Sequence, residues 1–300
     1  MATSGPHKQA GRLTASVLET TRVNDRGAGL VLLRDGAVGG VLSSSRTGLR
    51  LDVAGAAGPT TAADVERVIS RAASDLHLPL TVRDVVPLSM SDQRGLAMFF
   101  TGLGIALGSS ALVQGLNRMR IPLTWSQRVF ITGVFSVLTG VAGALLTGPV
   151  TGALPGPPVP VATTLALLSA AGALTTQALT QWVGAAGLPA ATVLFVGVGM
   201  PTSGGVVDTD LLPPAARSMS ALLPPGAAAR AIRNFCYFDG VHVVGPLLTL
   251  TGWATAAAAL LWARTATSRG PTPVPVHAGS DRNAGNGRSR TGPVVSRRGE

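Results

Sequence analysis

A stretch of 72 residues, Val129–Met200, contains no Lys, Arg, Asp, Glu or His. A water-soluble domain cannot cover its surface with such a segment, because charged side chains stay almost entirely at protein surfaces. Only 13% of the whole chain is charged, against about 25% in ordinary soluble domains. These features exclude an ordinary soluble enzyme and predict a protein of the lipid bilayer.

Five apolar segments are each close to the ~20 residues that a helix needs to cross a hydrocarbon core of ~30 Å. We expect an α-helical polytopic membrane protein whose transmembrane domain covers residues 95–264. Only a short break near Thr180–Trp182 separates the third and fourth segments, which predicts a tight helical hairpin. The predicted spans are residues 96–116, 129–150, 159–179, 181–200 and 241–264.

The chain before the first span predicts a small α+β domain over residues 28–94, preceded by a flexible N-terminus over residues 1–27. Asp35-Gly36 is typical of a hairpin turn, because glycine accepts the positive φ of a tight turn. A helix is expected over residues 61–76, capped by Thr60 or Thr61. The expected extended segments are Ala28–Arg34, Ala37–Leu42, Gly48–Val53 and Leu78–Leu88.

Positive charge predicts the orientation of the chain. The connection between the first two spans holds Arg118, Arg120 and Arg128, and residues 264–300 hold seven more arginines. With five spans these two segments lie on one side, which the positive-inside rule makes cytoplasmic. We therefore expect a multi-pass protein of the cell membrane whose N-terminal domain lies outside. The basic tail, residues 265–300, is predicted to be disordered and cytoplasmic, near anionic lipid rather than nucleic acid.

An outside N-terminal domain needs a hydrophobic segment to export it. Residues 1–25 contain no such apolar run, so they do not read as a signal peptide. Either a further span precedes this sequence or the orientation is inverted, and we favour a preceding span.

The loop over residues 201–240 holds two proline pairs, Pro213-Pro214 and Pro224-Pro225, each of which predicts the first turn of a short helix. We expect re-entrant or interfacial helices over residues 211–238. Its aspartates either bind a cation or relay protons, or they cap helices and lie in water. Its arginines either meet anionic headgroups or substrate, or they snorkel at the interface. The candidate extracytoplasmic site comprises Asp208, Asp210, Arg217, Arg230, Arg233, Asn234 and Asp239.

Few residues remain for catalysis. Lys8 is the only lysine, which excludes a P-loop ATPase, and Cys236 is the only cysteine. The four histidines are scattered, and no serine lies in a nucleophilic triad. We therefore predict no enzyme activity, no metal, no cofactor and no nucleic-acid partner.

Three short patterns resemble the phage-infection-protein-like membrane proteins, which are related to the type-2 permeases of ABC transporters. Leu222–Gly226, Arg233–Phe238 and Pro246-Leu247 resemble their last extracellular loop and final helix. Val85–Leu88 with Asp92–Phe100 resembles the junction between their extracellular domain and the membrane, and Leu51–Ala56 resembles the end of that domain. The resemblance covers about residues 28–265.

The resemblance implies an export permease, or a permease-like subunit, that moves a hydrophobic or amphipathic substrate. It also implies one helix before the extracellular domain, a re-entrant helical pair before the last span and a separate ATPase subunit. The spans would then form half of a pathway in a homodimer. Arg118, Arg120 and Arg128 are the candidate residues for coupling to the ATPase. The alternatives are a membrane scaffold or receptor linked to a secretion or surface system, and a truncated, non-functional fragment.

Overall fold

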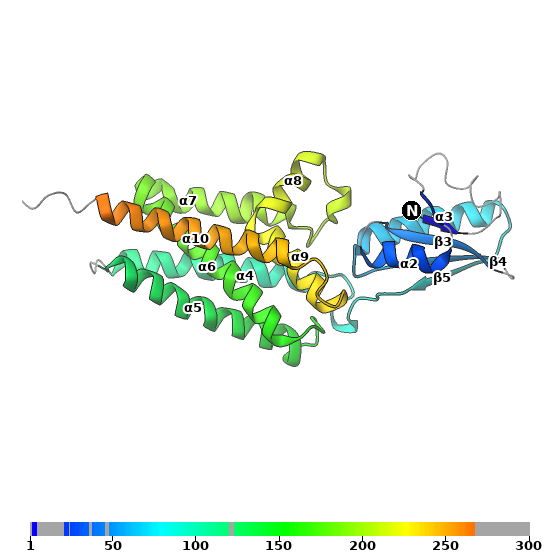
Figure 1. Ribbon diagram of the computed structural model, residues 1–300, viewed down its shortest axis with the longest axis horizontal. Coiled ribbons are helices and arrows are strands. Elements are labelled where there is room, and N and C mark those ends of the chain that lie inside the picture. Colours follow the sequence, from blue (N-terminus) through cyan, green and yellow to red (C-terminus); the bar gives the residue numbers. More distant parts are fainter. Residues whose placement is uncertain are drawn as a thin grey trace, which may run out of the picture.

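The computed structural model describes residues 2–4, 21–23, 25–35, 38–45, 48–119 and 123–267. A small N-terminal domain of strands and helices stands at one end of a long helical bundle (Figure 1). We call this end of the bundle the domain end and the opposite end the distal end. The predicted combination of a mostly helical chain with a small mixed domain agrees with this architecture.

A mixed sheet forms the centre of the N-terminal domain. Its longer strands are β3 (Gly40–Ser45), β4 (Gly48–Val53) and β5 (Leu80–Asp84). β3 and β4 pair antiparallel, with Val41 opposite Asp52, while β4 and β5 pair parallel. Two three-residue strands, β1 (Ala2–Ser4) and β2 (Thr21–Val23), extend the sheet beyond β3, so part of the segment expected to be flexible belongs to the sheet.

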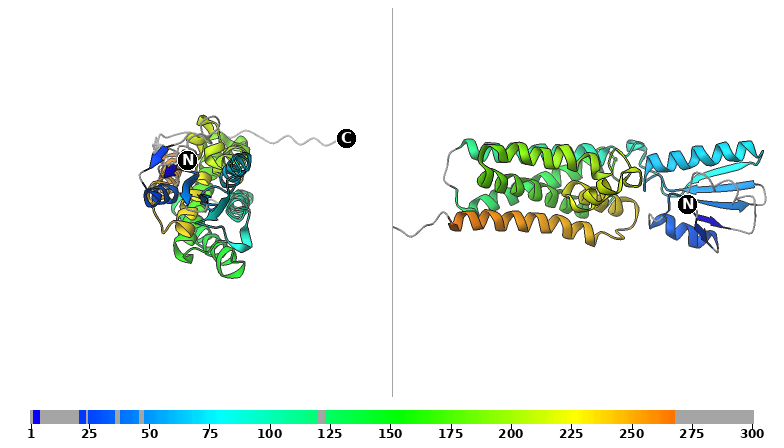
Figure 2. Two further views of the ribbon diagram at one scale, coloured as in Figure 1. Left: turned by 90° about the vertical axis from the view of Figure 1, so that its right-hand side faces the viewer. Right: turned by 90° about the horizontal axis from the view of Figure 1, so that it is seen from above.

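One helix covers each face of this sheet (Figure 2). Side chains alternate along a strand, so Leu42 and Leu51 reach one face and pack on α3 (Pro59–Asp75). Val41 reaches the other face and packs near Leu33 of α2 (Arg26–Arg34). Each face therefore has its own apolar core.

The prediction of a strand over Ala28–Arg34 and of a hairpin at Asp35-Gly36 was wrong. This segment is helix α2, because Asp25 caps it by accepting the backbone N–H of Ala28 at 2.6 Å. The helix is also tied to the sheet by Arg26, which binds the buried carboxylate of Asp52 through two nitrogens at 2.7 and 2.9 Å. The antiparallel pair is formed one element later, by β3 and β4.

The helix expected over residues 61–76 is α3, but its predicted cap was wrong. Pro59 stands in the first helical turn, so the helix begins before Thr60 and Thr61. The N-cap residue is Gly58, which has no side chain to offer.

Within the described residues, four helical segments are long and apolar enough to cross a membrane. They are α4 (Ala97–Arg118), α5 (Trp125–Leu145) with the π-helical turn Leu146–Val150, the segment Pro158–Gly199, and α10 (Val244–Thr267). The first, second and last correspond to predicted spans.

The third segment contains a reversal of the chain. Helix α6 (Pro158–Val183) ends at Gly184, whose φ of +69° is left-handed. The chain then runs back through α7 (Gly187–Thr192) and a π-helical turn, Val193–Gly199 (Figure 1). Gly187 packs so closely on Leu179 that an added Cβ would lie 2.4 Å from its carbonyl carbon. The two antiparallel legs correspond to the third and fourth predicted spans, with the turn slightly later than expected.

Helix α6 is the centre of the bundle and is buried along most of its length. It crosses α5 closely, because an added Cβ on Gly140 of α5 would lie 2.5 Å from the carbonyl oxygen of Ala162. Hydroxyl and amide groups join the helices elsewhere: Gln177 donates to the Thr132 hydroxyl at 2.7 Å. Small residues and such hydrogen bonds are the usual means of packing helices in lipid.

The two helices predicted from the proline pairs are present as α8 (Pro214–Leu222) and α9 (Pro224–Tyr237). An apolar face of α9 packs on the bundle core through Ala228, Ile232 and Cys236. The predicted tail falls outside the described residues, apart from residues 265–267 at the end of α10.

Candidate functional site

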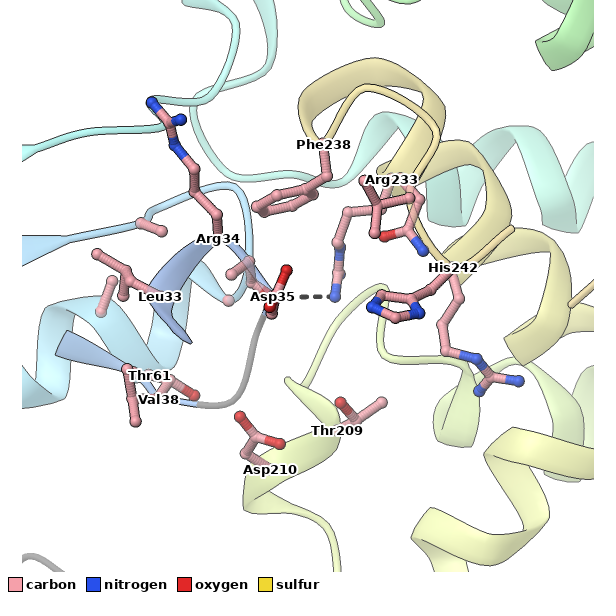
Figure 3. A pocket seen from close by; sticks show the side chains of 18 residues that line it. Leu33, Arg34, Asp35, Val38, Thr61, Thr209, Asp210, Arg233, Phe238 and His242 are labelled. Atoms are coloured by element: carbon pink, nitrogen blue, oxygen red, sulfur yellow. Dashed lines mark hydrogen bonds between the residues drawn. The ribbon is translucent and has the colours of Figure 1, made fainter. Parts of the chain in front are cut away.

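A cavity of about 290 Å³ lies between the N-terminal domain and the domain end of the bundle (Figure 3). The end of α2 and the start of α3 form one wall. The short helical turn Thr209–Leu211, α9 and the loop before α10 form the other. The polar residues that line it are Arg34, Asp35, Thr61, Thr209, Asp210, Arg230, Arg233, Asn234 and His242.

Asp208 caps a helix beside this cavity. Its carboxylate is buried and accepts the backbone N–H of Thr61 at 2.7 Å, in the first turn of α3. Gly58 makes room for it, since an added Cβ there would lie 2.7 Å from the same carboxylate oxygen. The expectation that the aspartates cap helices therefore holds for Asp208, but the capped helix belongs to the N-terminal domain and not to the loop that follows.

Arg233 joins the domain to the loop from its position on α9. One terminal nitrogen donates to the carbonyl of Ala57 at 3.0 Å, and the other to the carbonyl of Gly204 at 2.8 Å. Burial lowers the pKa of the Arg233 guanidinium, and the nearby carboxylates of Asp208 and Asp210 oppose that shift. The guanidinium stays protonated because arginine side chains are not deprotonated in proteins.

The other two arginines of this loop hold its own backbone. Arg230 donates to the carbonyls of Ser220 and Ala221 at 2.9 and 3.0 Å, which fixes the corner between α8 and α9. Burial lowers the pKa of Arg230, and the positive charge of Arg233 adds to this effect. Arg217 is exposed and donates to the carbonyls of Thr209 and Asp210 at 3.2 and 2.9 Å.

The loop between α9 and α10 completes the cavity. The backbone carbonyl of Asn234 accepts the N–H groups of Phe238 and Gly240, which ends α9. Asp239 and His242 have left-handed φ values of +50° and +57°. Aspartate and histidine enter this region more readily than most other non-glycine residues, so the two values describe the turn that follows α9.

The linker between β5 and α4 is held at the domain end as well. The hydroxyl of Ser89 donates to the carbonyl of Gly152 at 2.5 Å, and the Tyr237 hydroxyl accepts the N–H of Ser89 at 3.4 Å. Asp92 accepts the N–H groups of Leu96 and Ala97, at 2.9 and 3.0 Å, where α4 begins. The domain is thus joined to the bundle through its linker and through α9.

The structure brings together most of the loop residues that the sequence singled out. Asp210, Arg230, Arg233 and Asn234 line one cavity, and Asp208 lies beside it. Arg217 and Asp239 do not line it. The sequence did not identify Asp35, Thr61 or Phe238 as residues of this cavity, because residues so far apart in the chain carry no signal of their proximity.

Two of the predicted coupling residues lie at the distal end. Arg118 is the last residue of α4, Arg128 lies in the first turn of α5, and Arg120 falls outside the described residues. Two tryptophans make hydrogen bonds near this end. The indole of Trp125 donates to the carbonyl of Ala258, and that of Trp182 to the carbonyl of Leu260. The guanidinium of Arg264 lies 5.7 Å from the centre of the Trp182 ring.

Comparison of the chain with protein-family models, curated proteins and solved structures found no match. In the described part of the chain, no group of three or more His, Cys, Asp or Glu side chains is placed to hold a metal ion. The candidate site therefore rests on its own geometry.

Proposed function

We propose that this protein is a permease-like subunit of the ABC type-2 export kind, which lies in the cell membrane and moves a hydrophobic or amphipathic substrate with a separate ATPase. In this proposal the N-terminal domain is outside and the distal end faces the cytoplasm. The two legs around Gly184 each cross the bilayer, which makes five spans. The second leg, with its flanking turns, covers residues 184–203, about 30 Å at the helical rise per residue.

The observation that carries this proposal is the helical pair α8–α9. The pair follows the fourth span and precedes the last one, as the resemblance to phage-infection-protein-like proteins implies for a re-entrant pair. Its second helix is inserted against the bundle core through Ala227, Ala228 and Ile232. This packing fixes α9 to the bundle, which suits a re-entrant helix whose polar groups face protein.

The packing of the bundle supports a homodimer as the working form. The space between Met98, Leu168 and Ile232 amounts to about 10 Å³, room for one water molecule at most. A substrate therefore has no route through this part of a single protomer. The outward side chains of α5, such as Phe130 and Leu138, are more than 60% exposed and are available to lipid or to a second copy.

The test is ATP-dependent transport in inverted membrane vesicles that contain the protein at its native level. We expect accumulation of a lipophilic dye that stops when ATP is withheld, and ATP hydrolysis that copurifies with the protein in mild detergent. Two negative results together would exclude the ATP-driven form of the proposal. The vesicles would accumulate no dye, and the purified, folded dimer would have no associated ATP hydrolysis.

The distal arginines provide a test of coupling. Changing Arg118, Arg120 and Arg128 to Ala should abolish ATP-dependent accumulation, whereas changing all three to Lys should preserve it. Unchanged transport and unchanged ATPase association in the alanine variant would exclude a coupling role for this connection.

The second candidate is a membrane receptor or scaffold, and the interdomain cavity favours it. A cavity of about 290 Å³ with charged walls is near the lower limit of small-ligand sites. Specific ligand binding without any transport would favour this candidate over a permease.

A further inference from the structure

The charged side chains of the interdomain cavity are nearly balanced in sign. Arg230 and Arg233 line it on the α9 side, and Asp35 and Asp210 line it from the end of α2 and from the turn Thr209–Leu211. In Figure 3 the carboxylate of Asp210 and the ring of His242 point toward the space that the Arg233 guanidinium enters, while Arg34 points away. The cavity thus presents two positive and two negative groups.

These charges are not neutralised by direct contact with one another. Both arginines donate to neutral backbone carbonyls. Within the described residues, the ion pairs are Arg26 with Asp52 and Arg67 with Asp64, neither of which involves the cavity. The carboxylates of Asp208 and Asp210 act on the Arg233 charge only through space. In the described part of the chain, the side chains of Asp35 and Asp210 form no ion pair, so both carboxylates can receive a ligand.

A singly charged ligand fits this arrangement poorly. An anion would be attracted by the arginines but would face two carboxylates, and a cation would face two guanidinium groups. A ligand with one positive and one negative group can pair with the carboxylates and with the guanidinium groups at the same time. An ammonium group can meet Asp35 and Asp210, with the Phe238 ring beside it, since aromatic faces attract cations. A phosphate suits the arginines, because the planar guanidinium matches its oxygens.

The position of the cavity indicates where such a ligand occurs. Val241 and His242 line it, and α10 enters its apolar span at Val244. The cavity therefore lies next to the expected membrane surface. We propose that this cavity binds a small zwitterion with one ammonium and one phosphate group, supplied either as a phospholipid headgroup or as a free metabolite. The inference holds whether or not the protein transports anything.

The test measures calorimetric binding to the full-length protein in detergent, using phosphoethanolamine as the zwitterion. Inorganic phosphate and ethanolamine serve as its two halves. We expect phosphoethanolamine to bind at least tenfold more tightly than either half. Binding of phosphate alone with equal affinity would overturn the proposal in favour of a simple anion site.

A second measurement distinguishes the two sources. Native mass spectrometry of protein released from nanodiscs containing equal phosphatidylethanolamine and phosphatidylglycerol reports any retained lipid. Selective retention of phosphatidylethanolamine without binding of free phosphoethanolamine supports a headgroup ligand, and binding of the free compound supports a soluble one. If phosphatidylethanolamine is not retained and free phosphoethanolamine does not bind, the proposal is overturned.

Variants assign the binding to this cavity. Asp35→Asn with Asp210→Asn should weaken zwitterion binding at least tenfold while leaving phosphate binding equal or tighter. The matched control is Asp239→Asn, which removes an exposed carboxylate from the neighbouring loop without touching the cavity wall. Equal loss in the control, or no loss in the double variant, would overturn the assignment. Circular dichroism and an unchanged elution volume verify that each variant is folded.

Discussion

The carboxylate of Asp208 caps helix α3 by accepting the N–H of Thr61 at 2.7 Å, although 147 residues separate the two in the chain. A carboxylate at a helix N-terminus satisfies a free N–H group and interacts favourably with the helix dipole. The N-cap residue itself, Gly58, contributes no side chain to either effect. The bundle therefore completes an element of the N-terminal domain.

Replacing Asp208 with Ala should loosen this contact. Loss of a helix cap costs about 1 kcal/mol, so hydrogen exchange should accelerate in the first turn of α3 and at Ala57. The matched control is Asp64→Ala, which removes an exposed carboxylate further along α3 that pairs only with Arg67. Equal exchange in the two variants would show that the cap does not hold the domain to the bundle.

Two glycines test the packing of the bundle. Gly140→Ala should destabilise the protein by about 1–3 kcal/mol, because overpacking forces backbone to move, and the new Cβ would lie 2.5 Å from the Ala162 carbonyl oxygen. Gly104→Ala is the control, since a Cβ there meets nothing within 4 Å. Both changes gain helix propensity. Thermal unfolding in detergent should therefore fall only for Gly140→Ala, and equal midpoints would contradict the close crossing of α5 and α6.

How far the sequence predicts this structure depends on the range of the interaction. The spans follow from long apolar runs, and the reversal near Gly184 follows from the short polar break between two of them. The prediction for residues 28–34 was wrong because their apolar side chains also suit a strand. The segment forms helix α2, which is capped by Asp25. The cap on α3 had no sequence signal, because its acceptor stands in a loop 147 residues away. A still larger separation in the chain concealed the contribution of Asp35 to the cavity, whose opposite wall begins at Thr209.

Cys236 should react slowly at neutral pH. Burial raises the pKa of its thiol to about 11, although a backbone hydrogen bond with Gly156 opposes the shift, and only the thiolate reacts. A rise from about 9 to about 11 lowers the thiolate fraction at pH 8 about a hundredfold. The alkylation rate should then increase about tenfold per pH unit between pH 8 and 10. The denatured protein is the control, and its rate should level off above the ordinary thiol pKa of about 9. A plateau at that pH in the folded protein would contradict burial of the thiol.

The proposed orientation can be tested with two methionines. Met90, in the linker at the domain end, is 88% exposed, and Met119, at the distal end of α4, is 65% exposed. In a Cys236→Ala background, Met90→Cys should react with a membrane-impermeant maleimide on intact cells. Met119→Cys should react only after lysis, because positively charged ends are retained in the cytoplasm. The reverse pattern would establish the opposite orientation.

The reversal at Gly184 has a consequence for how the protein is inserted into the membrane during synthesis. The hairpin of α6 and α7 contains no charged residue, so neither leg carries a signal that the insertion machinery can use to retain one end. If the hairpin lies in the membrane as proposed, we expect its direction to follow from the charged residues on either side, Arg118 and Arg128 before it and Arg264 after it. Arg264, in the last turn of α10, lies over the Trp182 ring next to the turn, so the basic end of the last helix contacts the tip of the uncharged hairpin.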